Sequence, residues 1–181
     1  MIEMGVDGYS RGKNPQFEIS AAIHTFLANA RRGYTIRLPL FNSIQEHLTS
    51  VIQRQDEKVI LLTPAWPTQP WWTQILDMAV ALPIWIPPHP ANLVVADTER
   101  ADTRRFLLRQ DLLAWAISGV RQKGQSFRRT LQKRNLQQPE QILEKFMIFP
   151  GTGGSGLARK TTPKGQRILL GIYQLLSSPH F

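Results

Sequence analysis

The feature that most constrains the fold is a short apolar run between a charged segment and a proline. Val59–Thr63 has the sequence Val-Ile-Leu-Leu-Thr, follows the charged segment Gln55–Lys58 and ends before Pro64. A run of this length, rich in branched side chains, is typical of a strand that is buried on both faces. Such a strand needs a helical layer on each side, so the run predicts an α/β protein.

The residues around this strand predict a repeating pattern of strands and helices. The periodicity predicts a helix over Trp71–Leu82 and a second buried strand, Ile84–Ile86, which together with the first strand make a βαβ unit over about 59–86. We therefore expect a Rossmann-like, small three-layer domain with a short, mainly parallel sheet. The other expected elements are helices over Phe17–Ala30, 43–54, Thr103–Ile117, Pro139–Phe149 and Ile168–Leu176, and strands over Tyr34–Leu40 and Ala91–Ala96.

The composition changes along the chain and predicts three regions. We expect an irregular segment over 1–16, the α/β domain over 17–120, and a basic, helical extension over 121–181 that contains a Gly-rich linker at 150–165. The chain has no cysteine, which excludes disulfides, thiolate zinc sites and cysteine nucleophiles. It has no apolar run of membrane-spanning length and no secretory pattern. We expect an intracellular protein, nuclear or cytoplasmic, without membrane contact.

The charge is concentrated in the second half of the chain. Residues 1–99 contain 7 Lys/Arg and 9 Asp/Glu, whereas residues 100–181 contain 15 and 4, so the halves carry −2 and +11. A basic half beside a neutral one is typical of a protein that binds a polyanion, and many of its cations lie three or four residues apart. We expect phosphate contacts, with a merely solvated basic face as the alternative, from Arg104, Arg105, Arg109, Arg121, Lys123, Arg128, Arg129, Lys133 and Arg134.

Tryptophans follow the predicted strand at its carboxyl end, where open α/β sheets bind ligands. Trp66, Gln69 and Trp71 could stack on or bond to nucleobases there. The prolines around them equally suit a rigid turn whose indoles pack into the core, as we expect of Trp85 and Trp115. Both interpretations stay open at this point.

Three motifs in the middle of the chain resemble one family of retroelements. The block Trp66-Pro-Thr-Gln-Pro-Trp71 is similar to a Trp-Pro-x-Gln-Pro-Trp block of DIRS-like retrotransposon polyproteins, downstream of their reverse transcriptase and RNase H. Leu38–Ile44 resembles a worn form of the family's Pro-Pro-Phe segment, and Leu113–Gly119 resembles its Leu-x-Ala-Trp-x-x-Ser-Gly string. Order and spacing agree over about 38–135, a little over half of the chain.

The resemblance implies contact with RNA or DNA, and with other retroelement proteins or a larger assembly, but it carries no catalytic activity across. The acidic metal ligands of RNase H are not recognisable in this sequence, and His89 and His180 lack the following Arg of a tyrosine recombinase. We therefore expect a non-catalytic nucleic-acid-binding module. A structural subunit that contacts RNA within a larger assembly is an alternative.

An enzymatic alternative depends on a glycine-rich string. Phe149–Gly156 fails as a P-loop and as a nucleophile elbow because Leu157 follows it, but it resembles the Phe-x-Gly-x-Gly loop of amino-methyltransferases of permuted order. Thr63-Pro-Ala-Trp66 would be the catalytic counterpart, degraded at its first and third positions. The four scattered histidines and the lack of a carboxylate pair at ligand spacing predict no metal site, and we expect no cofactor.

Overall fold

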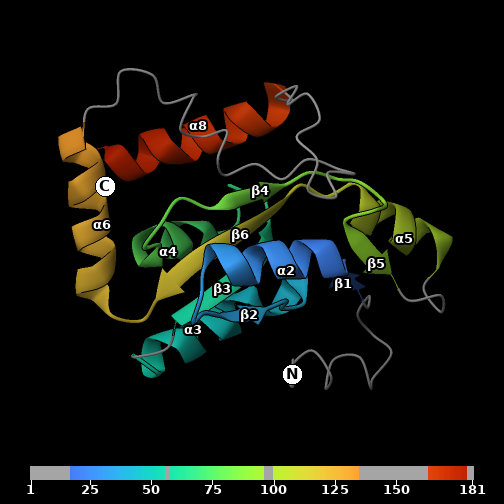
Figure 1. The fold of residues 1–181 in the computed structure, drawn as a ribbon, viewed down its shortest axis with the longest axis horizontal. Helices are drawn as coiled ribbons and strands as arrows, with labels where there is room; N and C mark the ends of the chain where they lie inside the picture. The colour runs from blue at the N-terminus through green and yellow to red at the C-terminus, as the bar shows by residue number, and fades with distance from the viewer. Residues whose placement is uncertain (1–16, 56–57, 96–99, 135–162, 179–181) are drawn as a thin grey trace.

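The computed structural model describes residues 17–55, 58–95, 100–134 and 163–178 (Figure 1). Strands and helices alternate through most of these residues, so the protein has a mixed α/β fold. In chain order the elements are β1 (Phe17–Ile19), α2 (Ala21–Ala30), β2 (Thr35–Arg37), the 3-10 turn η1 (Phe41–Ser43), α3 (Ile44–Gln53), β3 (Lys58–Pro64), α4 (Pro70–Met78), β4 (Ile84–Ile86), β5 (Leu93–Val95), α5 (Ala101–Leu108), β6 (Leu112–Ser118), α6 (Arg121–Arg134) and α8 (Pro163–Ser177).

The central sheet has four strands in the order β2-β3-β6-β4. Strand β2 is parallel to β3, whereas β6 is antiparallel to both of its neighbours, β3 and β4. The predicted strands Val59–Thr63 and Ile84–Ile86 are therefore confirmed, and they run in the same direction because each opposes β6. The prediction of a mainly parallel sheet is wrong, since β6 separates the two strands of the predicted βαβ unit.

Strand β6 is also the largest error in the predicted elements. A helix was expected over Thr103–Ile117, but the chain forms α5, turns, and enters the sheet at Leu112. Every residue of β6 is buried, and its seven residues pair with β3 from Ser118 opposite Lys58 to Leu112 opposite Pro64. A short apolar run such as Leu112–Ser118 is compatible with a buried strand or a buried helix. Here its pairing with β3 favours the strand.

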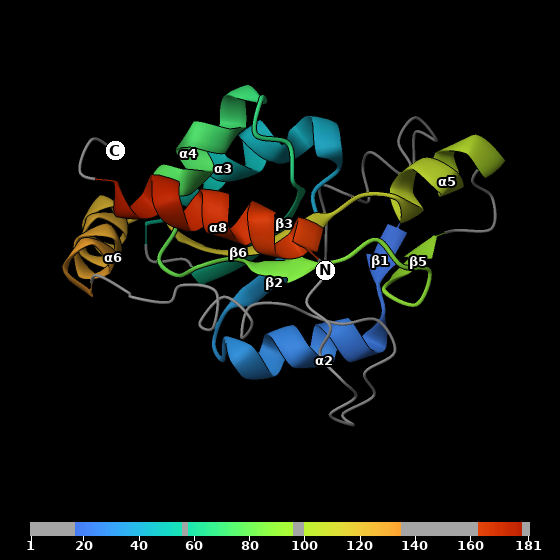
Figure 2. The same cartoon turned by 90° about the horizontal axis from the view of Figure 1, so that it is seen from above.

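Apolar side chains cover both faces of the sheet, as a three-layer arrangement requires. Successive residues of a strand point to opposite faces. Leu61 and Trp115 join the core formed with α3, α4, α6 and α8, whereas Ile60 and Leu62 join a second core with β1 and α2. Figure 2 shows α3 and α4 on one side of the sheet and α2 on the other.

The ends of two predicted helices are corrected by strand pairing. The helix expected over Phe17–Ala30 begins only at Ala21, because Phe17–Ile19 pairs with β5 and the Ser20 hydroxyl accepts a hydrogen bond from the Ile23 amide at 3.4 Å. The helix expected over Trp71–Leu82 ends at Met78, and Ala79 forms a bridge to Ile117 on β6.

The described part of the predicted C-terminal extension packs on the same sheet. Leu131 of α6 and Leu169, Ile172 and Leu176 of α8 belong to the core that contains α3 and α4. Helix α8 confirms the expected final helix, but it begins at Pro163, inside the range expected to be a linker. The helix expected over Pro139–Phe149 lies outside the described residues. Within the described residues, no helix combines the length and apolarity that crossing a membrane requires.

Candidate nucleic-acid interface

Helix α6 carries the densest positive charge in the described structure. Its 14 residues include no Asp or Glu. Gly124, Arg128 and Leu131 are buried, so the opposite side of the helix faces outward. The exposed basic side chains on α6 are Arg121, Lys123, Arg129, Lys133 and Arg134, hereafter the α6 cations.

The buried side of α6 lies close to the end of α4. A Cβ added at Gly124 would overlap the main-chain carbonyl oxygen of Asp77, so glycine is what allows the two helices to approach. This contact fixes which face of α6 is turned outward and holds the α6 cations on the surface. In Figure 1, α6 forms one end of the molecule beside the last turn of α8.

Arg128 is not one of the outward cations and must be removed from the predicted phosphate contacts. It is only 7% exposed. Its guanidinium donates to the main-chain carbonyl of Asp77 at 2.7 Å and forms an ion pair with the Asp77 carboxylate at 3.1 Å. Because its donors bond the end of α4, its charge stabilises the packing of α6 on α4.

The structure divides the predicted basic set into two groups. Arg104, Arg105 and Arg109 belong to α5 and its C-cap, before β6, whereas the α6 cations follow β6. A seven-residue strand spans roughly 20 Å, so the two groups lie at opposite ends of the sheet. Both views show α5 and α6 at opposite ends of the molecule (Figures 1 and 2).

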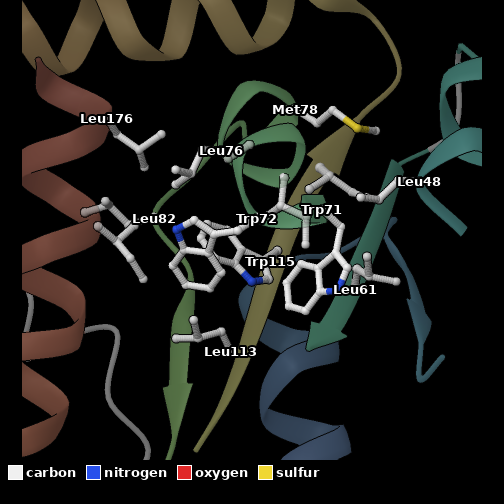
Figure 3. Packing of buried hydrophobic residues seen from close by; sticks show 14 of the residues in the cluster. Leu48, Leu61, Trp71, Trp72, Leu76, Met78, Leu82, Leu113, Trp115 and Leu176 are labelled. Atoms are coloured by element: carbon white, nitrogen blue, oxygen red, sulfur yellow. The ribbon is translucent and has the colours of Figure 1, made fainter. Parts of the chain in front are cut away.

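The tryptophan block belongs mainly to the core. Trp71 is 5% exposed, and its ring lies 6.2 Å from that of Trp72, which in turn packs edge-on against Trp115 at 5.4 Å (Figure 3). A nucleobase has no access to Trp71, so the packing interpretation holds for that residue, and the expected burial of Trp85 and Trp115 is confirmed. Trp66 is half-buried, and Gln69 is exposed at the N-cap of α4.

Two aromatic residues near Trp66 were missed in the sequence. Phe41 lies 5.2 Å from Trp66, and Phe106 lies 6.3 Å from it, each measured between ring centroids. Phe106 is 46% exposed. The error over Thr103–Ile117 hid it, because a long helix accounts for an apolar residue at this position as part of the buried face.

The enzymatic alternative receives no support from the described residues. Thr63 would stand first in the degraded catalytic motif, but it is fully buried, and its hydroxyl accepts a hydrogen bond from Trp115 Nε1 at 2.9 Å. The glycine-rich string at 149–156 lies outside the described residues. In the part of the chain that the structure describes, no three His, Asp or Glu side chains gather as metal ligands would.

The fold and this surface define a mixed α/β protein with a basic helix at one end of its sheet. No family model, curated protein or solved structure matches the chain.

Proposed function

We propose that this protein is a non-catalytic nucleic-acid-binding module that contacts phosphates through the outward face of α6. The observation that carries the proposal is the set of five exposed α6 cations on a helix without a carboxylate. The resemblance to the retroelement region between reverse transcriptase and recombinase supports the same class of ligand. That resemblance also makes a retroelement origin part of the proposal.

The positions of several α6 cations work against the stability of α6, although Lys133 and Arg134 in its last turn are favoured by the helix dipole. Arg121 and Lys123 lie in the first turn, where positive charge opposes the helix dipole. Arg129 and Lys133 are four residues apart, and like charges at this spacing destabilise a helix. Among the described residues, none of the α6 cations forms an ion pair that would offset this repulsion. A bound polyanion would offset the repulsion among the α6 cations.

Neutral polar residues separate the cations and suit a surface that binds without reading sequence. Gln122, Gln125, Ser126, Thr130 and Gln132 lie between the charges. Thr130 donates its hydroxyl to the Ser126 carbonyl and Gln132 its side-chain amide to the Ser178 carbonyl. The side chains of Gln122, Gln125 and Ser126 supply donors of the kind that bond phosphate oxygens. We therefore expect binding to RNA and DNA that tolerates many sequences and weakens steeply with salt.

The test is a fluorescence anisotropy titration of the full chain with labelled DNA and RNA duplexes at several salt concentrations. If the α6 cations neutralise about four phosphates, the affinity falls roughly hundredfold between about 50 and 200 mM salt. The double variant Arg129→Gln, Lys133→Gln should reduce the slope of log K against log salt by about 2. Both residues are exposed, so the fold is kept.

A matched control removes the same charge elsewhere. Arg31→Gln, Arg32→Gln alters the turn after α2, outside the basic half of the chain, and should leave the slope unchanged. Equal losses from both double variants would show a general effect of net charge and would contradict a site on α6. Absence of binding to every duplex at about 50 mM salt would refute the function itself.

A further inference from the structure

Three aromatic rings gather where the two parallel strands end. Phe41 follows β2 and Trp66 follows β3, and their ring centroids lie 5.2 Å apart, edge to face. Phe106 of α5 lies 6.5 Å from Phe41 and 6.3 Å from Trp66. We call Phe41, Trp66 and Phe106 the aromatic shelf.

The aromatic shelf lies at the end of the sheet and contacts both cores. Trp66 packs against the core that contains α3 and α4, whereas Phe41 packs against the core that contains α2. Because β2 and β3 are parallel neighbours, their carboxyl ends meet at one edge. This is the edge at which open α/β sheets bind ligands.

Ring packing and two hydrogen bonds through Gln110 order the shelf. Trp66 Nε1 donates to the Gln110 side-chain oxygen at 3.1 Å, and the Gln110 amide nitrogen donates to the Phe106 carbonyl at 3.0 Å. Gln110 therefore links the turn after β3 to the end of α5. A surface whose rings are fixed beforehand loses little entropy when a planar ligand stacks on it.

Two exposed arginines of α5 and its C-cap lie near Phe106, the exposed ring of the shelf. Phe106 is 46% exposed, and Arg109, three residues later at the C-cap of α5, is exposed as well. Residues at this spacing are neighbours on a helix surface. Arg105 is exposed four residues before Arg109, on the helix face that adjoins Phe106. An exposed ring with one guanidinium group beside it and a second on the adjoining helix face matches a base with its phosphates, since unpaired bases stack on aromatic rings while arginines hold the backbone.

We infer that the aromatic shelf binds an unpaired nucleobase, which stacks on Phe106 while Arg105 and Arg109 contact the adjacent phosphates. The inference rests on the proposed function, because it assumes a nucleic-acid ligand, and it adds a second contact at the opposite end of the sheet from α6. It also predicts that the protein prefers single strands to duplexes, a preference that phosphate contacts on α6 cannot supply. A duplex hides its base faces, so only a single strand uses the shelf.

The experiment compares a single-stranded oligonucleotide with a duplex of the same length for the wild type and Phe106→Ala. Loss of a stacking ring should weaken single-strand binding by roughly 5- to 150-fold and leave duplex binding unchanged. Phe26→Ala is the matched control, since Phe26 is 42% exposed on α2 and lies outside the shelf. It should change neither affinity.

A second variant separates stacking from a general apolar contact. Phe106→Leu keeps an apolar side chain but has no ring, so it should lose single-strand affinity as Phe106→Ala does. Full affinity in Phe106→Leu would show that the single strand meets only a general apolar contact there and not a stacking ring, and would overturn the inference. So would single-strand binding that is indifferent to Phe106→Ala. In both cases salt-dependent duplex binding through α6 would still stand, whereas a protein that binds no nucleic acid refutes both proposals.

Discussion

At the scale of single residues, two glycines of α8 have opposite surroundings. A Cβ added at Gly165 would overlap the indole ring of Trp85, which is buried and donates its Nε1 hydrogen to Asp111 at 3.0 Å. A Cβ added at Gly171 would meet nothing within 4 Å. The first glycine therefore allows α8 to lie against the sheet, whereas the second has no such role.

Substitution of each glycine by alanine should change stability in opposite directions. Gly165→Ala forces the ring of Trp85 or the helix to move and should lower the free energy of unfolding by about 1–3 kcal/mol. Gly171→Ala removes backbone freedom from the unfolded chain and should raise it by about 0.5–1 kcal/mol. Urea denaturation measures both. Stabilisation by both substitutions would show that α8 does not pack on Trp85.

The neighbouring arginines of α6 show why the candidate site was only partly predictable. Arg128 and Arg129 are adjacent and identical in the sequence, but the first is buried against Asp77 and the second is exposed. Only the helical phase relative to α4 distinguishes them. That phase is set by the close approach at Gly124, which is a tertiary contact without a sequence signature.

At the scale of elements, the runs with strong periodicity or continuous apolar character were predicted well. Val59–Thr63 and Ile84–Ile86 lie in β3 and β4, and Ile168–Leu176 lies in α8. The failure at β6 has a physical cause. Leu112–Ser118 contains two alanines and two leucines, which favour helix when nothing pairs with them, and the partner that selects a strand lies about fifty residues earlier in the chain.

The central position of β6 predicts which strands are best protected from local unfolding. Amide hydrogens of β3 and β6 should exchange only through global unfolding, because both strands are paired on each side within the sheet. Amides of the two-stranded β1–β5 sheet should exchange faster, since an isolated strand pair is only marginally stable. Hydrogen exchange followed by NMR tests this ranking. Exchange over 112–118 as fast as over 93–95 would contradict a central strand there.

At the scale of the whole molecule, one strand determines how the charged surfaces are arranged. The sequence predicts a single basic set from Arg104 to Arg134, but β6 lies between its two halves and carries them to opposite ends of the sheet. The aromatic shelf adjoins one end and the α6 cations form the other. Two contacts roughly 20 Å or more apart on one body bind a polyanion differently from one continuous patch.

This separation predicts that the length of a single-stranded probe changes how many probes bind. A probe of about 3 nucleotides is too short to reach from the shelf to α6 even when it is extended, whereas one of about 20 nucleotides can contact both. The wild type should therefore bind two short probes but one long probe. Both contacts acting together on the long probe should raise its affinity well above that of either site alone.

Variants at each end supply the control. Phe106→Ala, or the double variant Arg129→Gln, Lys133→Gln, should each reduce the number of short probes from two to one, because the other end still binds. On the long probe, either change should remove the gain in affinity that comes from joining the two contacts. Calorimetric titration gives both the stoichiometry and the affinity. One short probe per wild-type molecule, weakened alike by both variants, would mean that the two ends form one site.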